Sequence, residues 1–165
     1  MAIVILVVLG TALVSAQTFS ITVQGNITDW ALTPGIDNID TGTTTLTVVA
    51  SDPAPWSVIV KDGNDEGKPS GHEGSLVEYN ITNSGYVSNP RVLASPIKVM
   101  GYGGTGLTNS TVTLGQTSQP IETGTTSGTF GPVQIAFVQT VTYSDPHLKN
   151  GNLYKITVTF TGGYN

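Results

Sequence analysis

"TTLTVVASDPAPWSVIVK", residues 44–61, contains two short apolar stretches separated by a turn that holds two prolines. In the second stretch Trp56, Val58 and Val60 alternate with other residues, which is the spacing of a β-strand that has one face in a core. The prolines lie between the stretches, where a missing backbone N–H does least harm to a sheet. The pattern predicts two β-strands joined by a turn.

The same alternation recurs along most of the chain after residue 17. Further strands are predicted at 18–23, 75–80, 95–102, 110–115, 133–143 and 153–160. In "VQIAFVQTVTY" (133–143) both faces carry apolar residues, which favours a central strand that is covered on each side. About eight strands at turn-marked intervals favour an all-β fold, a two-sheet β-sandwich, with a closed barrel as the alternative.

Residues 1–16, "MAIVILVVLGTALVSA", are predicted to be a secretory signal peptide. The apolar run from Ile3 to Val14 is too short to span a bilayer as a helix. It ends in small residues, so we expect cleavage after Ala16 and a single β-sandwich domain over residues 17–165. No Lys or Arg precedes the apolar run, and retention of the segment as an N-terminal helix is the alternative.

Composition limits the partners of the chain. Of its 165 residues only 10% are charged, against roughly 25% in an average globular protein. The net charge is −5 and the six Lys and Arg residues are scattered, so nucleic acid and anionic membrane surfaces are poor partners. There is no cysteine and no second long apolar segment, so we expect neither a disulfide nor a stable membrane span after signal cleavage.

Three N-x-[ST] sequons accompany the predicted export. They begin at Asn26, Asn80 and Asn109, in polar or turn-flanked settings. Each is a predicted site of N-glycosylation in an extracellular or cell-surface protein.

"KDGNDEGKPSGHEG" (61–74) has the ligand spacing of a calcium loop. Counted from Asp62, oxygen-bearing side chains stand at positions one, three, five and twelve, namely Asp62, Asn64, Glu66 and Glu73. Gly67 stands at position six, where such a loop turns sharply. Calcium is therefore the one cofactor that the sequence suggests.

Other features of this loop weaken the calcium interpretation. A strand rather than a helix is predicted to enter it, Pro69 replaces an apolar residue at position eight, and Lys61 and Lys68 bring positive charge. The alternative is a polar loop between strands, whose Asp and Asn residues favour turns.

The sequence contains no recognisable catalytic set. It has no nucleophile elbow, no H-E-x-x-H motif and no phosphate-binding glycine loop. The histidines, His72 and His147, both stand in polar stretches and are interpreted as solvated. We therefore expect a protein that is not an enzyme, and a secreted hydrolase with an unrecognised site is the remaining alternative.

Three segments resemble parts of WxL-type surface domains. "TLTVVASDPAPWSVIVKD" is similar to their first half, "SPIKV" to their next short strand, and "GNLYKITVTFTG" to their closing strand, with Phe160 in the place of a tryptophan. Secreted, Thr-rich single-domain β proteins of archaeal cell surfaces are also similar. The resemblance implies an exported β-sandwich with a structural or adhesive role, and wall binding is not carried over because that tryptophan is missing.

These features together predict a non-catalytic extracellular structural protein, a self-assembling subunit of a filament, pilus-like fibre or sheath. Homo-polymers of this kind form by strand addition, and "QTFSITVQG" (17–25), with Thr18, Ser20 and Thr22, is the predicted contact. An ordinary first strand within the same chain is the alternative reading of that segment. The alternative function is a module that binds carbohydrate or cell wall, a surface glycan being the partner, through Trp30, Tyr86, Tyr102 and acidic residues of loops.

Overall fold

The computed structural model describes residues 17–28, 30–63, 66–102, 108–148 and 151–165, and the predicted signal segment lies outside these ranges. The described residues form twelve β-strands in three antiparallel sheets, without a helix. None of them lies in a helix long and apolar enough to cross a membrane. The all-β prediction is confirmed.

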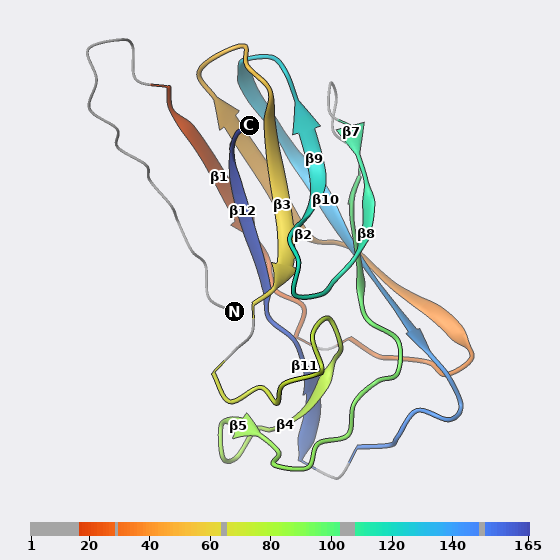
Figure 1. Cartoon of the computed structure of the whole chain (residues 1–165). Coiled ribbons are helices and arrows are strands. Elements are labelled where there is room, and N and C mark those ends of the chain that lie inside the picture. The colour runs from red at the N-terminus through yellow and green to blue at the C-terminus, as the bar shows by residue number, and fades with distance from the viewer. Residues whose placement is uncertain (1–16, 29, 64–65, 103–107, 149–150) are drawn as a thin grey trace.

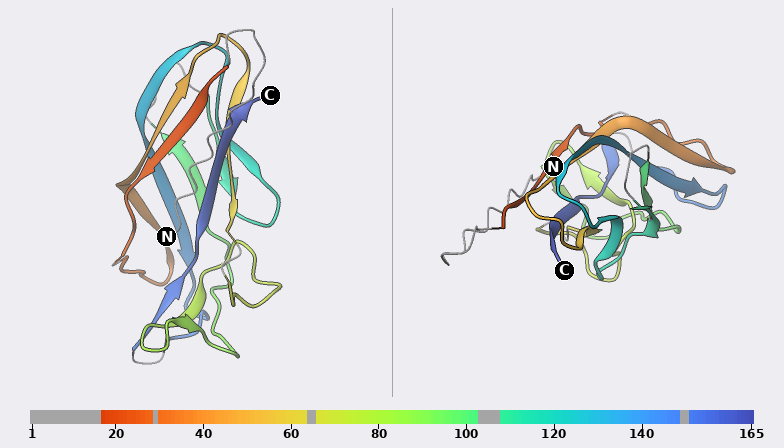
Figure 2. Two further views of the ribbon diagram at one scale, coloured as in Figure 1. Left: turned by 90° about the vertical axis from the view of Figure 1, so that its left-hand side faces the viewer. Right: turned by 90° about the horizontal axis from the view of Figure 1, so that it is seen from above.

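The two larger sheets form two layers, and the small one lies at one end of the molecule (Figure 1). The five-stranded sheet has the order β1 (Phe19–Gln24), β2 (Ile36–Ala50), β10 (Gly128–Val141), β6 (Lys98–Tyr102) and β8 (Thr111–Thr113). The four-stranded sheet has the order β12 (Val158–Tyr164), β3 (Trp56–Asp62), β9 (Gln119–Gly124) and β7 (Thr108–Asn109). The small sheet has the order β11 (Asn152–Lys155), β4 (Val77–Asn80) and β5 (Gly85–Tyr86). Figure 2 shows the two layers edge-on from above.

The sheets therefore differ from the predicted pair in number. The stretch predicted at 153–160 is divided between β11 and β12, which belong to different sheets. Strand β2 begins at Ile36, well before the apolar alternation at 44–50, because β10 pairs with it along its whole length. The fold is sandwich-like, and β11 belongs to a third, small sheet outside the two main layers.

The main core lies between the two layers. It combines residues of both large sheets, namely Val23, Leu46, Val48, Ala50, Trp56, Val58, Val60, Ile97, Val99, Leu114, Ile121, Val133, Ile135 and Phe137. Trp56 is fully buried, and its indole N–H donates a hydrogen bond to the carbonyl of Thr126 at 3.1 Å. The interpretation of Trp56 as a core residue is confirmed.

Strand β1 is an ordinary first strand of its own chain in this structure. It runs antiparallel to β2, from the pair Phe19–Ala50 to the pair Gln24–Thr45. Ile21 contributes to the inward face, and Ser20 lies on the exposed face. The alternation predicted from the sequence is confirmed here.

A carboxyl group is buried between the layers. Glu122 of β9 is fully buried, and Gly101 of β6 leaves the space that its side chain fills. Burial disfavours the ionised form and raises the pKa of Glu122 to about 7, from 4.5.

This burial makes folding stability depend on pH. Between pH 4.5 and about 7 the unfolded chain loses the Glu122 proton while the folded chain keeps it, so stability falls as pH rises. The loss approaches about 3 kcal/mol for a shift of this size. We expect Glu122→Gln to remove this part of the pH dependence and to be the more stable protein at pH 8.

Urea unfolding of both proteins at pH 4.5, 6 and 8 provides the measurement. The difference between the two free energies of unfolding isolates Glu122 from the other titrating groups. A difference that stays constant with pH would contradict the prediction.

Candidate functional site

The loop at 61–74 is closed by a buried ion pair. Asp62, the last residue of β3, is buried, and its Oδ2 accepts a hydrogen bond from the Lys68 ammonium. The same oxygen accepts a second hydrogen bond from the backbone N–H of Gly74 at 2.6 Å. Lys68 is almost as buried as Asp62, so its charge and that of Asp62 compensate each other inside the protein.

The other predicted calcium ligands do not join Asp62. Glu66 is exposed, and Asn64 lies outside the described residues. The Glu73 carboxylate accepts a hydrogen bond from the backbone N–H of Gly71 at 3.2 Å, and the N–H groups of Glu73 and Gly71 lower its pKa. The described residues contain no group of three or more His, Cys, Asp and Glu side chains that could hold a metal ion. Calcium binding stays a prediction, and a lysine ammonium is the cation beside Asp62.

We expect Lys68→Met to destabilise the protein by about 3–5 kcal/mol, because Asp62 is then buried without its cation. The double variant Asp62→Asn with Lys68→Met should recover part of that loss. Lys61→Met is the matched control, because Lys61 is exposed, and it should change stability by less than about 0.5 kcal/mol. Urea unfolding measures the stability of all three variants. A loss of stability in Lys68→Met no larger than that in the control would speak against the lysine as the cation of this loop. A higher urea midpoint of the wild-type protein in millimolar calcium would also speak against it.

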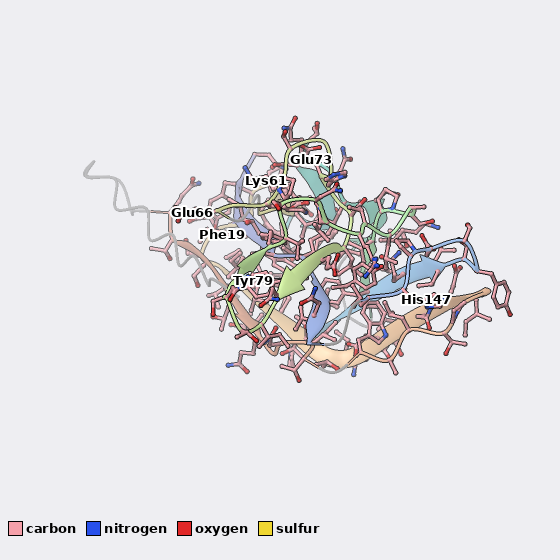
Figure 3. All side chains as sticks on the ribbon, turned by 90° about the horizontal axis from the view of Figure 1, so that it is seen from below. Phe19, Lys61, Glu66, Glu73, Tyr79 and His147 are labelled. Atoms are coloured by element: carbon pink, nitrogen blue, oxygen red, sulfur yellow. The ribbon has the colours of Figure 1, made fainter. Side chains whose placement is uncertain are left out.

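A groove of about 920 Å³ lies at the end of the molecule that holds the small sheet. Three segments contribute most of its lining, namely 26–34, 141–148 and 152–160, together with Thr44, Leu76, Tyr79, Leu93, Ile97 and Phe137. Every residue from Asn152 to Val158 lines it, so the groove follows the edge of β11 and of its link to β12, and not one face of β11. In Figure 3, which looks at this end, Tyr79 lies on the side of the small sheet and His147 on the side of β2 and β10.

Most of the polar side chains in the groove already have partners in the protein. Asp145 accepts hydrogen bonds from the backbone N–H groups of Ala94 at 2.8 Å and Thr142 at 2.6 Å. Asn152 donates to Glu78 at 2.6 Å. These groups hold loops and strands together, and the groove offers mainly apolar surface.

The lysine at the groove is held by aromatic rings. The Lys155 ammonium lies 4.5 Å from the centre of the Tyr79 ring and 5.7 Å from that of Tyr86. The two rings meet edge to face at 5.3 Å. The faces of the two tyrosine rings, on β4 and β5, therefore stabilise the positive charge of Lys155.

The structure separates the three sequons. Asn26 is exposed at the groove. The Asn80 side chain donates to Asn152 Oδ1 at 3.0 Å and accepts from the backbone N–H of Asn83 at 2.8 Å. Asn109 belongs to β7, and the structure describes its backbone but not its side chain. Glycosylation stays a prediction, and Asn26 is the accessible one of the two described side chains.

The residues predicted for glycan binding do not form one surface. Trp30 lines the groove from the connection between β1 and β2, Tyr86 belongs to the small sheet, and Tyr102 belongs to the five-stranded sheet. Of the histidines, His147 lines the groove, and the carbonyl of His72 accepts a hydrogen bond from Ser75. Glycan binding through this set stays a prediction without a common site.

One lateral side of the molecule is formed by two edge strands that carry no charge. In the described sheets β1 borders only β2, and β12 borders only β3. Neither FSITVQ nor VTFTGGY contains a charged residue or a proline. The two strands lie side by side (Figure 1), and the rings of Phe19 and Tyr164 are 5.4 Å apart.

The predicted contact residues Thr18, Ser20 and Thr22 stand on the exposed side of this edge. Thr18 precedes β1 and is bonded to Ser51, whose side chain accepts its N–H at 2.8 Å. Their role in subunit contact stays a prediction. The groove and the packing of β1 beside β12 have no signature in the sequence, because residues far apart in the chain form them.

Comparison with protein-family models, with curated proteins and with solved structures gives no match. The resemblance to WxL-type surface domains therefore has no independent support and stays a prediction.

Proposed function

We propose that the protein is a non-catalytic extracellular structural subunit that joins copies of itself by β-strand addition. The observation that carries the proposal is the uncharged lateral side formed by β1 and β12. The backbone groups on the outer side of an edge strand form hydrogen bonds with any strand that reaches them.

Soluble β proteins commonly protect such edges with charges, prolines, bulges or very short strands. The opposite edges of the two sheets, β7 and β8, have only two and three residues and so are protected by their length. Strands β1 and β12 have six and seven residues, and the register of both with their neighbours is regular. Strand addition is therefore favoured on the lateral side of β1 and β12.

A second candidate function is the binding of carbohydrate in the groove. Trp30, Tyr79 and Tyr154 line it, and aromatic rings are the usual platforms for sugars. The binding of a sugar also needs polar groups that are free to bond hydroxyls, and Asp145, Asn152 and several backbone groups there are already bonded within the protein. Self-assembly is the function that the geometry supports better.

A lysine on the exposed side of β1 should block assembly. We expect Ser20→Lys to reduce the polymer fraction at least tenfold, because its charge stands at the edge where another strand would add. Val49→Lys is the matched control, since Val49 lies opposite Ser20 on β2, which is an inner strand with neighbours on both sides.

Negative-stain microscopy and analytical ultracentrifugation of the secreted protein give the measurement. Polymers formed equally by both variants would contradict edge addition at β1. A wild-type protein that stays monomeric at all concentrations and is retained on a glycan column would favour the carbohydrate candidate.

A further inference from the structure

The described residues of 17–34, which exclude Asp29, form an N-terminal arm that lies on the rest of the described chain. The arm consists of β1 and the connection 25–34, and the body begins at Gly35, whose N–H donates to the carbonyl of Val141 at 2.7 Å. Within the described residues no strand precedes β1, so the arm can leave the body without carrying another described strand with it.

The body carries a close-fitting site for the strand of the arm. The Phe19 ring lies 5.8 Å from that of Trp56 and 5.4 Å from that of Tyr164. At Gly162 of β12 a Cβ atom would come within 2.5 Å of the Phe19 ring and 2.7 Å of Ile21. The absence of a side chain there is therefore needed for the arm to lie against β12.

The connection lies more loosely than the strand. Ile27, Trp30 and Leu32 are only half-buried, and they line one side of the groove of about 920 Å³. Protein interiors are normally packed to the density of organic crystals, so this segment gains less from its contacts than a core segment does. The polar side chains Asp145 and Asn152 are bonded elsewhere. The hydrogen bonds of the connection to the body include those of the Thr33 backbone with the Asn38 side chain, at 2.7 and 3.1 Å.

Glycines with positive φ stand at both ends of the connection. Gly25 has a φ of 100° and packs against the backbone of Thr43, and Gly35 has a φ of 87° beside the ring of Tyr143. Pro34 precedes Gly35. Such positions change their backbone direction at low cost, because glycine adopts either sign of φ.

We propose that residues 17–34 are exchanged between copies, so that the arm of one copy pairs with β2 of the next and its connection lies in the groove of that copy. Gly35 is the hinge. The proposal rests on the proposed function as one form of strand addition between copies, and it names β2 as the strand that accepts the addition: the partner is a second copy of this chain. Exchange preserves the contacts of Phe19 and Ile21 and makes them between chains, so its cost is limited to the hinge and to the association itself.

Donor and acceptor surfaces differ, so donation from each copy to the next produces a fibre wherever the rotation between copies does not close a ring. Because the connection lies in the groove of the acceptor copy, only the backbone at Pro34 and Gly35 joins the two copies. The exchange therefore places the hinge of one copy directly beside the groove of the next.

A disulfide distinguishes exchange from simple contact, because the chain has no cysteine of its own. Thr22 and Thr47 are directly opposite on β1 and β2, on the outer side of the sheet. Opposite residues of antiparallel strands lie about 4.5–5.5 Å apart, within the range of a disulfide. We expect the variant Thr22→Cys, Thr47→Cys, assembled under reducing conditions and then oxidised, to run as a ladder of covalent multimers on a non-reducing gel.

Oxidation of the same variant before assembly should fix each arm to its own body and reduce the polymer fraction at least tenfold. Thr45→Cys with Gln134→Cys is the matched control, because both positions lie in the body, opposite each other on β2 and β10. It should run as a monomer whether it is oxidised before or after assembly. Ser20→Cys with Val49→Cys, the opposite pair nearest to the start of β1 on the same face, serves if the first variant does not fold.

A polymer of the Thr22, Thr47 variant that oxidises only to monomers would overturn the exchange and leave the proposed function intact. Oxidation to dimers alone would support exchange and limit it to closed pairs. A wild-type chain that never assembles would overturn both proposals.

Discussion

The position of the Trp56 side chain determines how the rest of the fold is arranged. Its ring lies between the layers, 5.2 Å from the ring of Phe130 on β10 and 5.8 Å from that of Phe19 on β1. On β9 only a glycine, Gly124, leaves room for it. One side chain thus joins four strands of two sheets, and it makes β1 part of the core although β1 is at an edge of its sheet. The contact with Phe19 connects the folding of the body to the position of the N-terminal arm.

The alternation of apolar residues predicted most strands of the core but not β9, which carries Ile121. It also missed the first half of β2, which forms by backbone pairing without an apolar pattern. The first half of β2 reads IDNIDTG, which has no apolar alternation, yet β10 pairs with it. Asn38 is buried there, and its amide donates to the carbonyls of Thr33 at 3.1 Å and Gln139 at 3.2 Å. A polar residue is stable inside a protein when its hydrogen bonds are made, and a sequence does not show which distant carbonyl will accept them.

The candidate sites show the same limit in another form. The spacing of acids at 61–74 predicted that oxygens gather around a cation, and Asp62 does hold one, the ammonium of Lys68. From the sequence, Lys68 was interpreted only as a positive charge close to the loop. Its burial beside Asp62 could not be predicted, because burial depends on how the whole chain folds. The groove could not be predicted at all, because its three main segments begin at residues 26, 141 and 152 and meet only after β2, β10 and β11 are in place. The periodicity of apolar residues predicts a single strand, whereas several strands and loops together form a groove.

The edge formed by β1 and β12 combines two demands that usually conflict. The inward face of β1 needs tight packing, which Phe19, Ile21 and the glycine at 162 provide. The outward edge needs protection against other strands, and neither a charge nor a proline provides it. If the strand is exchanged between copies, the tight packing becomes the affinity between copies, while the outer edge of β1 stays open to a further strand. The balance between free and joined chains then depends on concentration and on the backbone at Gly35, since the contacts on the two sides of that balance are the same.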